Sequence, residues 1–269
     1  MVGDWRQSKR RIGFVPTMGA LHEGHLALVR ASLEECNRTV VSIFVNPLQF
    51  DRATDLETYP REEEKDRALL ADAGVQVLFM PRAEDFYPPG FATRVSQPEL
   101  SRHLCGATRP GHFDGVLTVV LKLFNAVLPD RAYFGQKDYQ QVTLIERMVR
   151  DLGLPVEIRR QPTVREPDGL AMSSRNKLLR PEDRVEAPRI HAALQDAEAA
   201  FRAGNREGLP GRVESALKSI PGARIDYVEL ASGDVLSPRE GPARAGDVLA
   251  VALFLGPVRL IDNLVLGDA

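Results

Sequence analysis

The chain has 269 residues, of which 43% are hydrophobic and 27% are charged, a composition near the globular average that argues against wholesale disorder. Its length fits one large domain or a large and a small one. The 35 basic and 37 acidic residues give a formal net charge of -2. Because the basic residues are scattered, and sequence-blind binding to nucleic acid depends on clustered Lys and Arg, we expect no nucleic acid partner.

The amino terminus, MVGDWRQSKRR, is basic and is followed by a short apolar stretch that ends at Pro16. No signal-peptide core or cleavage pattern is recognisable there, and no apolar run in the sequence approaches membrane-spanning length. The two cysteines, Cys36 and Cys105, are too few for a disulfide framework and too far apart for a CxxC metal site. We therefore expect reduced thiols in a cytoplasmic protein without a membrane partner.

Five short apolar runs rich in β-branched or aromatic residues predict buried strands in the first part of the chain. They are residues 12–15, 40–45, 75–80, 132–134 and 156–158. Apolar residues at helical spacing lie between them, at residues 26–33, 66–73 and 116–127. Strands that alternate with helices favour right-handed βαβ units. The sequence therefore predicts an α/β fold with a Rossmann-like parallel sheet and helices on both faces, and ligands at the carboxyl ends of its strands.

The composition changes after about Val164. Residues 181–203 and 207–220 are Ala-rich and helical in pattern, whereas residues 225–230, 248–254 and 259–266 resemble strands. Turn signals occur at Gly233-Asp234 and Gly256-Pro257. Helices followed by strands of this kind predict a smaller α+β C-terminal domain. We expect a Rossmann-like nucleotide-binding domain at residues 1–163 and the α+β domain at residues 164–269.

The sharpest local signal is PTMGALHEGH, residues 16–25, between the first predicted strand and the first predicted helix. His22 and His25 lie on one face of a helical turn, and Gly24 lets a ligand approach the backbone. The start of a helix offers N–H groups and a positive dipole end to a phosphate, and imidazoles beside them can donate to its developing charge. The pattern favours nucleotide phosphate binding. Two alternatives are a zinc site, which needs a third ligand, and histidines that only cap the helix.

A second cluster, FGQKDYQQ at residues 134–141, again follows a predicted strand. Lys137 can neutralise a β- or γ-phosphate, Asp138 can accept from ribose hydroxyls, and Gly135 leaves room for the sugar. A solvated turn would have the same pattern, so this cluster is weak evidence by itself.

A third cluster, Ser173, Ser174 and Arg175, follows the turn signal Pro167-Asp168-Gly169. Two hydroxyls and a guanidinium make a phosphate clamp that a mobile loop can bring onto a triphosphate. The alternative is a serine that merely caps the following segment.

Together the three clusters resemble the HIGH and KMSKS motifs of the adenylate-forming nucleotidyltransferases. From about residue 12 to the end, longer segments are similar to the pantothenate synthetase family: PTMGALHEGH, VVSIFVNPLQF, RPGHFDGVLTVV, FGQKDYQQ, PTVREPDGLAMSSRN and RLIDN. The resemblance implies a homodimeric ligase that uses ATP and Mg²⁺. ATP and (R)-pantoate would give pantoyl adenylate and pyrophosphate, and β-alanine would then attack the acyl group to give pantothenate and AMP.

The resemblance also implies a role for each matching residue. His22 and His25 contact the phosphates, with His25 in the proton-donor position, and Lys137 stabilises the developing charge. The other residues implied to hold phosphate or to form the ATP site are Ser173, Ser174, Arg175, Met18, Gly19, Gly135, Gln136, Asp138, Val164 and Met172. The positions implied for pantoate and β-alanine are Gln49, Gln141, Asn46 and Met18. Asp66 is the candidate for helping to place magnesium on the triphosphate, and residues 164–269 are expected to close as a lid.

Three features depart from the family's pattern. The chain begins nearly at the first predicted strand, so we expect an outer strand to be absent. Gln136 replaces the commoner Glu beside Lys137, and Cys105 stands where many relatives have Glu. None of these positions has a direct chemical role in the implied reaction.

The residues alone leave two other functions open. One is a nucleotidyltransferase that ends at a nucleotide-linked product, although it has no use for Gln49 and Gln141 as a pair. The other is a regulatory module that senses ATP without turnover, which does not need groups such as His22, His25 and Lys137 to stabilise a transition state.

Overall fold

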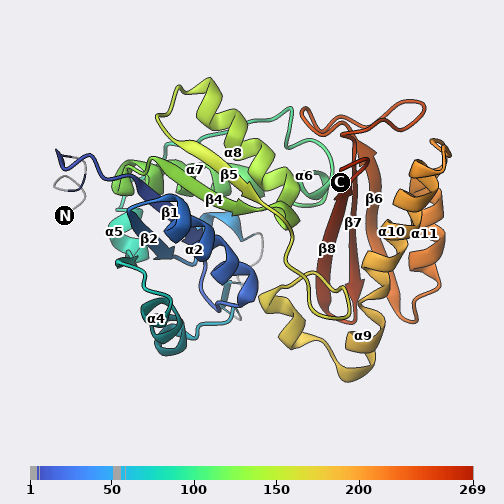
Figure 1. Cartoon of the computed structure of the whole chain (residues 1–269), viewed down its shortest axis with the longest axis horizontal. Coiled ribbons are helices and arrows are strands. Elements are labelled where there is room, and N and C mark those ends of the chain that lie inside the picture. The colour runs from blue at the N-terminus through green and yellow to red at the C-terminus, as the bar shows by residue number, and fades with distance from the viewer. Residues whose placement is uncertain (1–4, 6, 51–55, 58, 269) are drawn as a thin grey trace. The chain divides into compact units, whose positions relative to one another are not determined.

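The computed structural model describes residues 5, 7–50, 56–57 and 59–268 (Figure 1). The chain divides into two compact units. The first unit comprises Met1–Pro98, Arg109–Gln136 and Gln141–Pro162, and the second comprises Glu99–Thr108, Lys137–Gln140 and Thr163–Ala269. Two short segments that precede residue 163 therefore belong to the second unit, and Lys137 is in a different unit from Gly135.

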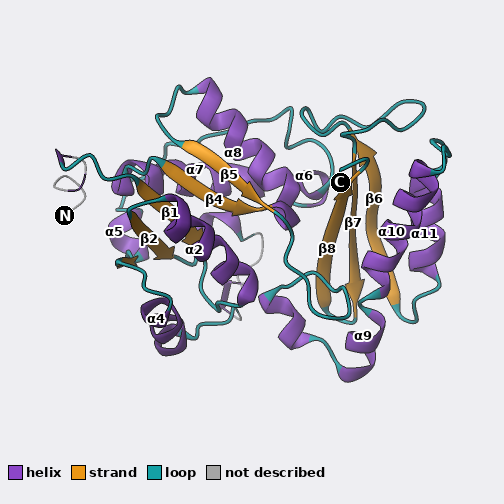
Figure 2. Ribbon diagram, in the orientation of Figure 1, coloured by secondary structure: helices purple, strands orange, loops and turns teal. Residues whose placement is uncertain are grey.

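The first unit contains a five-stranded parallel sheet with strand order β3-β2-β1-β4-β5 (Figure 2). Its strands are β1 (Ile12–Thr17), β2 (Arg38–Ile43), β3 (Val77–Phe79), β4 (Arg131–Gly135) and β5 (Glu157–Gln161). The accompanying helices are α2 (Glu23–Glu35), η1 (Pro47–Gln49), α4 (Glu63–Asp72), α5 (Ala83–Phe86), α7 (His112–Val127), η2 (Gln136–Asp138) and α8 (Tyr139–Asp151), and η2 and α8 include residues of the second unit. The predicted parallel sheet is confirmed.

Helices cover both faces of this sheet, as the sequence predicts. On one face, Val15 of β1 packs in a buried cluster with Leu28 of α2 and Leu70 of α4. The neighbouring Phe14 points to the opposite face, because side chains alternate along a strand. There it meets Phe124 of α7 edge to face, with ring centroids 6.3 Å apart. The strand therefore buries apolar side chains on both faces, which is why it forms an apolar run in the sequence.

The order of the strands reverses beside β1, which has β2 on one side and β4 on the other. In open α/β sheets, ligands bind outside the carboxyl ends of the strands at such a switch point. Residues 18–25 follow the carboxyl end of β1, and Gly135 ends β4. Two of the predicted binding segments thus follow adjacent strands.

Strand β5 extends further than its sequence predicts, to Gln161. Its last residues are charged, and each arginine has an acidic partner. Arg159 Nη2 donates to Glu35 Oε1 at 2.9 Å, and Arg160 Nη2 donates to Glu146 Oε2 at 2.7 Å. Partly exposed, paired arginines give no apolar run, so the predicted strand ends too early.

Helix α8 is missing from the sequence prediction, which treats its first residues as part of a binding loop. Its buried residues Val142, Ile145 and Met148 are spaced three apart, which is a helical pattern. This signal was available in the sequence, and the Gln-rich start of the helix hides it.

The second unit contains a three-stranded antiparallel sheet with order β6-β7-β8. Its strands are β6 (Ala223–Ala231), β7 (Val248–Leu255) and β8 (Val258–Val265). Its helices are α6 (Cys105–Thr108), η3 (Ser174–Leu178), α9 (Pro181–Glu186), α10 (Arg189–Arg202) and α11 (Leu209–Lys218). Leu194 of α10 and Val213 of α11 pack in one buried cluster with Leu249, Val251 and Leu260 of the sheet. The predicted α+β character of this region is confirmed.

One predicted helix, residues 181–203, is two helices in the structure. Pro188 is the N-cap of α10, with φ -61° and ψ -22°. Because proline has no N–H, it cannot continue the hydrogen-bond ladder of α9. The predicted turn at Gly256-Pro257 links β7 to β8, and Gly256 adopts the positive φ of 54° that such a hairpin favours.

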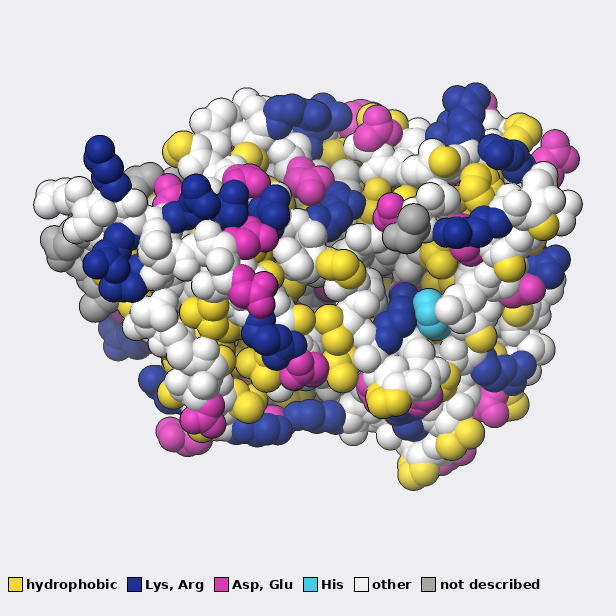
Figure 3. Space-filling model, viewed as in Figure 1, with side chains coloured by type: hydrophobic (Ala, Val, Ile, Leu, Met, Phe, Trp, Pro, Cys, Tyr) yellow, Lys and Arg dark blue, Asp and Glu magenta, His cyan; other side chains and the backbone are white. Residues whose placement is uncertain are grey.

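Charged side chains of both signs cover the surface. On the face that Figure 3 shows, Lys and Arg side chains lie interspersed with Asp and Glu. Many form ion pairs, such as Arg131 with Glu157 at 2.8 Å and Arg212 with Asp196 at 2.5 Å. Within the described ranges, no helix is both long and apolar enough to cross a membrane.

Candidate active site

Helix α2 begins with two histidines that cap its first turn. His22 is the N-cap residue, and its Nδ1 accepts a hydrogen bond from the backbone N–H of Gly24 at 3.1 Å. His25 Nδ1 accepts from the backbone N–H of His22 at 3.3 Å. The two ring centroids are 4.1 Å apart. We call residues 22–25 the histidine turn, and its reciprocal caps hold both imidazoles in fixed orientations.

The caps also determine which ring nitrogen carries the proton. A neutral imidazole has one donor nitrogen and one acceptor nitrogen. Because Nδ1 of His22 and Nδ1 of His25 both accept from backbone amides, Nε2 carries the proton in each neutral ring. The histidines therefore do cap the helix, and in doing so they become Nε2–H donors, the form that hydrogen-bonds to a phosphate oxygen.

A buried carboxylate from α4 holds the loop that precedes the histidine turn. Asp66 is 1% exposed, and its two oxygens accept from the backbone N–H groups of Ala20 and Leu21, each at 2.8 Å. Gly19 has a positive φ of 81°, and a Cβ there would lie 3.1 Å from Asp66 Oδ2. The loop thus requires glycine both for its conformation and for the close approach of the carboxylate.

These contacts do not suit Asp66 as a magnesium ligand. Mg²⁺ needs oxygen ligands in near-octahedral geometry, whereas both Asp66 oxygens are directed at backbone amides in an almost fully buried position. In the described part of the chain, no group of three His, Cys, Asp or Glu side chains is arranged to hold a metal ion. The zinc alternative for the histidine turn therefore has no third ligand among these residues.

A cavity of about 460 Å³ opens beside the same loop. Met18 and Gly19 line it together with residues at the ends of β2 and β3, so it lies at the carboxyl edge of the sheet. Arg61, Arg67 and Arg82 also line it. Its volume is in the range of small-molecule sites. Glu62, Glu63 and Asp66 line it as well, so Met18 and Gly19, both predicted for the ATP site, border a cavity with groups of both charges.

Asn46 and Gln49, predicted for pantoate, form a buried amide pair. Asn46 Nδ2 donates to Gln49 Oε1 at 3.0 Å and to the main-chain oxygen of Gly115 at 3.1 Å. Asn46 Oδ1 accepts from the Tyr87 hydroxyl at 2.9 Å. Gln49 Nε2 lies 2.8 Å from Met18 Sδ. Asn46 thus holds the side chain of Gln49 in place, and the amides of both residues have partners within the protein.

Two residues that the sequence pattern does not single out fix the backbone of η1. His112 Nδ1 lies 2.8 Å from the main-chain oxygen of Gln49, and Arg109 Nη2 donates to the same oxygen at 3.1 Å. A Cβ at Gly115 would lie 2.2 Å from the main-chain oxygen of Leu48, so a glycine is needed for α7 to pack this closely. The motif RPGHFDGV contains all three residues, and its role here is to hold Gln49.

The remaining predicted residues of the first unit follow β4. A Cβ at Gly135 would meet no atom within 4 Å, so there is open space beside this residue. Gln136 begins η2, and Gln141 lies in the first turn of α8; both are partly exposed. The open space at Gly135 agrees with the room that a sugar would need.

In the second unit, the carboxyl-terminal strand sets the position of Lys137. The main-chain oxygen of Lys137 accepts from Asn263 Nδ2 of β8 at 2.8 Å. The ammonium lies 3.8 Å from Asp138 Oδ2, and the Lys137 side chain is 18% exposed. Lys137 is therefore a largely buried cation whose long ion pair only partly compensates its charge.

Five predicted residues lie on one loop of the second unit. Val164 and Met172 are side by side, because the Met172 N–H donates to the main-chain oxygen of Val164 at 3.0 Å. Ser173 caps η3, with its Oγ accepting from the Arg175 N–H at 3.3 Å. Ser174 is buried, whereas Arg175 is exposed. The serine cap expected as an alternative is thus present, and the loop also places a guanidinium at the surface.

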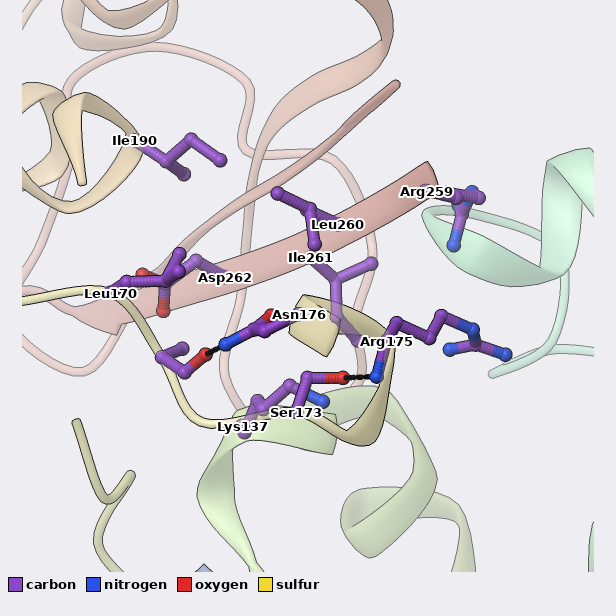
Figure 4. Close-up of a pocket in the computed structure, with 11 residues that line it drawn as sticks. Lys137, Leu170, Ser173, Arg175, Asn176, Ile190, Arg259, Leu260, Ile261 and Asp262 are labelled. Carbon is purple, nitrogen blue, oxygen red and sulfur yellow. Dashed lines mark hydrogen bonds between the residues drawn. The ribbon is translucent and has the colours of Figure 1, made fainter. Parts of the chain in front are cut away.

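Lys137, Ser173 and Arg175 line the same pocket (Figure 4). Its other polar lining residues are Asn176, Arg259 and Asp262. The cavity is about 10 Å³, roughly the room for one water molecule. A phosphate group is larger, so binding of phosphate here requires a rearrangement, for which the exposed Arg175 side chain is best placed.

Arg259 explains how a cysteine is tolerated at position 105. Its Nη1 lies 3.8 Å from Cys105 Sγ, and its Nη2 pairs with Asp226 at 2.7 Å. Asp226 supplies the negative charge that the guanidinium needs. A glutamate at position 105 is therefore not required for charge balance.

The parallel sheet reverses its strand order beside β1, and a capped helix start follows that strand. Together with a cavity at the carboxyl edge of the sheet, these features define an α/β protein of the nucleotide-binding class. The sequence profile of the family described as pantoate-beta-alanine ligase matches residues 1–265. The chain therefore belongs to the pantoate-beta-alanine ligase family, as its motifs predict.

Individual relatives agree with this assignment. The chain is 54% identical over 264 residues to the pantothenate synthetase of Moorella thermoacetica, covering 97% of this chain and 93% of that one. Its fold matches the crystal structure of pantothenate synthetase from Thermus thermophilus with a TM-score of 0.92 and 48% identity, over 98% of this chain and 97% of the other. It also matches pantoate-beta-alanine ligase from Francisella tularensis, complexed with beta-gamma ATP and beta-alanine, with a TM-score of 0.81 and 39% identity over 98% and 94% of the two chains.

Proposed function

We propose that this protein makes pantothenate by joining (R)-pantoate to β-alanine at the expense of ATP, through a pantoyl adenylate, and so serves coenzyme A biosynthesis. Membership of the pantoate-beta-alanine ligase family over residues 1–265 supports this reaction. The observation that carries the mechanism is the histidine turn, whose backbone contacts make both rings Nε2–H donors at the start of α2.

In the first step, a carboxylate oxygen of pantoate attacks the α-phosphorus of ATP. The new bond joins that oxygen to phosphorus, and the bond from the α-phosphorus to the bridging oxygen of the β-phosphate breaks, so pyrophosphate leaves. Negative charge grows on the phosphate oxygens during this exchange. His22, His25 and Lys137 donate hydrogen bonds to those oxygens, with His25 as the proton donor, and this stabilises the transition state.

In the second step, the amine of β-alanine attacks the acyl carbon of pantoyl adenylate. The C–N bond forms, the C–O bond to AMP breaks, and the amine proton is lost to solvent. Catalysis in both steps consists mainly of positioning and charge stabilisation.

Pantoate is a small hydroxy acid, and we assign its binding to the amides of Gln49 and Gln141. An amide can donate to a carboxylate and accept from a hydroxyl without the full charge that would weaken the carboxylate as a nucleophile. Asn46 orients Gln49, and Met18 lies against the same amide.

We assign ATP-binding residues in each unit separately. In the first unit, the open space beside Gly135 suits the sugar, and Gln136 follows it. In the second unit, Asp138 can accept from ribose hydroxyls. Val164 and Met172 border the adenosine, and the phosphates are assigned to Ser173, Ser174 and Arg175, whose hydroxyls and guanidinium suit them.

Magnesium enters this scheme as part of the substrate MgATP, because Asp66 does not fit as its ligand. We also propose a homodimer, which light scattering of the purified protein tests directly. A lid role for residues 164–269 and a cytoplasmic location remain predictions.

The deciding experiment supplies ATP, pantoate and β-alanine in turn to the purified protein. Pyrophosphate should form with ATP and pantoate alone, and pantothenate and AMP should follow in equal amounts when β-alanine is added. Release of ADP instead would indicate an acyl phosphate and contradict the mechanism. A stable nucleotide-linked product would favour the rival nucleotidyltransferase, and ATP binding without turnover would favour the sensor.

A further inference from the structure

The segment RLIDN, residues 259–263, has no role in the chemistry above, although it lies beside the pocket of Lys137. It forms the middle of β8, which is an edge strand because it pairs only with β7. Side chains alternate between the two faces of a strand, so Asp262 and Asn263 point to opposite faces. Each of them holds a different segment of the second unit.

Asn263 holds the segment that contains Lys137. The Asn263 side chain is almost buried, with 6% of the residue exposed, and its Nδ2 donates to the main-chain oxygen of Lys137 at 2.8 Å. A lysine side chain has four flexible carbons, so its backbone anchor largely determines where the ammonium can reach. Loss of this hydrogen bond would also remove a donor from the main-chain oxygen of Lys137.

Asp262 holds the loop that leads to Ser173. Its two oxygens accept from Arg165 Nη1 at 2.7 Å and Nη2 at 3.0 Å, and Arg165 Nη1 also donates to the main-chain oxygen of Gly169 at 3.1 Å. Arg165 pairs with Ala171 in an antiparallel bridge. The bidentate pair therefore fixes a small hairpin whose end is two residues before Ser173.

The turn that contains Arg175 is tied to the same hairpin. Asn176 Nδ2 donates to the main-chain oxygen of Ala171 at 3.1 Å, a contact drawn in Figure 4, and to Glu166 Oε1 at 2.7 Å. The backbone on either side of Arg175 is thereby held, while its own side chain is exposed.

We propose that Asp262 and Asn263 are positioning residues for adenylate formation, because from opposite faces of one strand they fix the spacing between Lys137 and the phosphate-binding loop of residues 173–175. The inference rests on the proposed role of Lys137 at the phosphates. It extends that role by explaining why the backbone of Lys137 is fixed in position.

The test measures pyrophosphate release in a single turnover, with ATP and pantoate but no β-alanine, in the full-length protein. Asn263→Ala should lower the rate about tenfold, as expected for loss of one hydrogen bond that aligns a reacting group. The KM for pantoate should change less than about twofold, because Asn263 does not contact that substrate in the proposed scheme. Asn263→Ser, which keeps a donor of shorter reach, should have an intermediate rate.

The decisive comparison is the double variant with Lys137→Ala. If Asn263 acts through Lys137, then Asn263→Ala causes no further loss in the Lys137→Ala background. Asn37→Ala is the matched control, because it also removes a side-chain contact to a backbone group, that of Arg11 N–H at 2.9 Å in the first unit, and it should keep the wild-type rate.

The outcomes separate the two proposals. Two outcomes would overturn the positioning role alone. One is a double variant whose rate falls by the product of the two single reductions. The other is a near-normal rate for Asn263→Ala and Asn263→Ser when Lys137→Ala is slow. A wild-type protein that releases no pyrophosphate would contradict the proposed function itself. If Asn263→Ala does not fold, as shown by its circular dichroism, the Asn263→Ser rate and its coupling to Lys137→Ala decide the question.

Discussion

The histidine turn of the first unit and the Lys137 pocket of the second unit are built in different ways. In the histidine turn, backbone amides fix the rings of His22 and His25, and Asp66 fixes the loop before them. In the Lys137 pocket, side chains fix the backbone, and the guanidinium of Arg175 remains exposed. If phosphate binds at both places as proposed, the first arrangement already presents its donors, whereas the second has only about 10 Å³ of room and must rearrange. The contrast indicates that preorganisation and adaptability are divided between the two units.

The largest effect is expected for Lys137→Ala. Removal of the cation that stabilises the developing charge should slow adenylate formation by on the order of a hundredfold or more, with little change in pantoate binding. Single-turnover release of pyrophosphate measures this rate. Lys218→Ala, an exposed lysine on α11, is the control. A near-normal rate for Lys137→Ala would mean that the Lys137 pocket contributes no essential charge.

Asp66→Asn should weaken the support of the histidine turn. Asparagine places an NH2 donor where one of the two carboxylate oxygens accepts from Ala20 N–H or Leu21 N–H. One buried donor therefore loses its partner, at a cost of about 1–3 kcal/mol in the free energy of unfolding. Urea denaturation measures this change. Asp72→Asn, on the exposed side of the same helix, should cost less than about 0.5 kcal/mol. Equal effects at the two positions would show that the loop does not depend on the carboxylate.

Arg175→Ala tests the adaptable side of the comparison. We expect about a tenfold slower adenylate formation, because a guanidinium contact to phosphate is lost. If Arg175 also helps to exclude water from the reactive anhydride, part of the pantoyl adenylate will be hydrolysed. The ratio of pantothenate to AMP at saturating β-alanine should then fall below one. A ratio that stays at one would limit Arg175 to phosphate binding.

The smallest effect concerns the stability of the second unit. Burial, and then the charge of Arg165, lower the pKa of His191 below its usual value of 6.5, and Asp262 only partly opposes this. The unfolded chain therefore binds a proton more readily than the folded one as the pH falls through 6.5 and below, so stability should decrease in that range. We expect a loss of a fraction of a kcal/mol, measured by urea denaturation at several pH values. His191→Gln should remove this part of the pH dependence, and an unchanged profile would assign it to other groups.

The sequence predicts those parts of the fold and the site that depend on local patterns. Strand β1 is recognisable because both of its faces are apolar, and the histidine turn because its residues are close together in the chain. Strand β5 is predicted too short, because its arginines are held by acidic partners such as Glu35, which is 124 residues from Arg159. A local pattern cannot reveal such a pair.

The supporting residues of the site are missed for the same reason. Asn263 is 126 residues from Lys137, and His112 is 63 residues from Gln49. Asp66 is a candidate for magnesium in the sequence, but the two amides that occupy its oxygens lie 45 and 46 residues earlier. Residue type indicates which interactions a side chain can make, but only the fold determines which partner it contacts.

The way that η1 rests on α7 has a consequence for altering the specificity of the enzyme. His112 contacts the main-chain oxygen of Gln49, and Gly115 packs against the main chain of Leu48 and Gln49. Asn46 Nδ2, by contrast, contacts the glutamine side chain. Replacement of Gln49 by another residue of similar size should therefore leave the backbone where it is. If Gln49 binds pantoate as proposed, a small library at this single position is the most economical route to variants that accept other hydroxy acids, whereas changes at Gly115 would displace the whole turn.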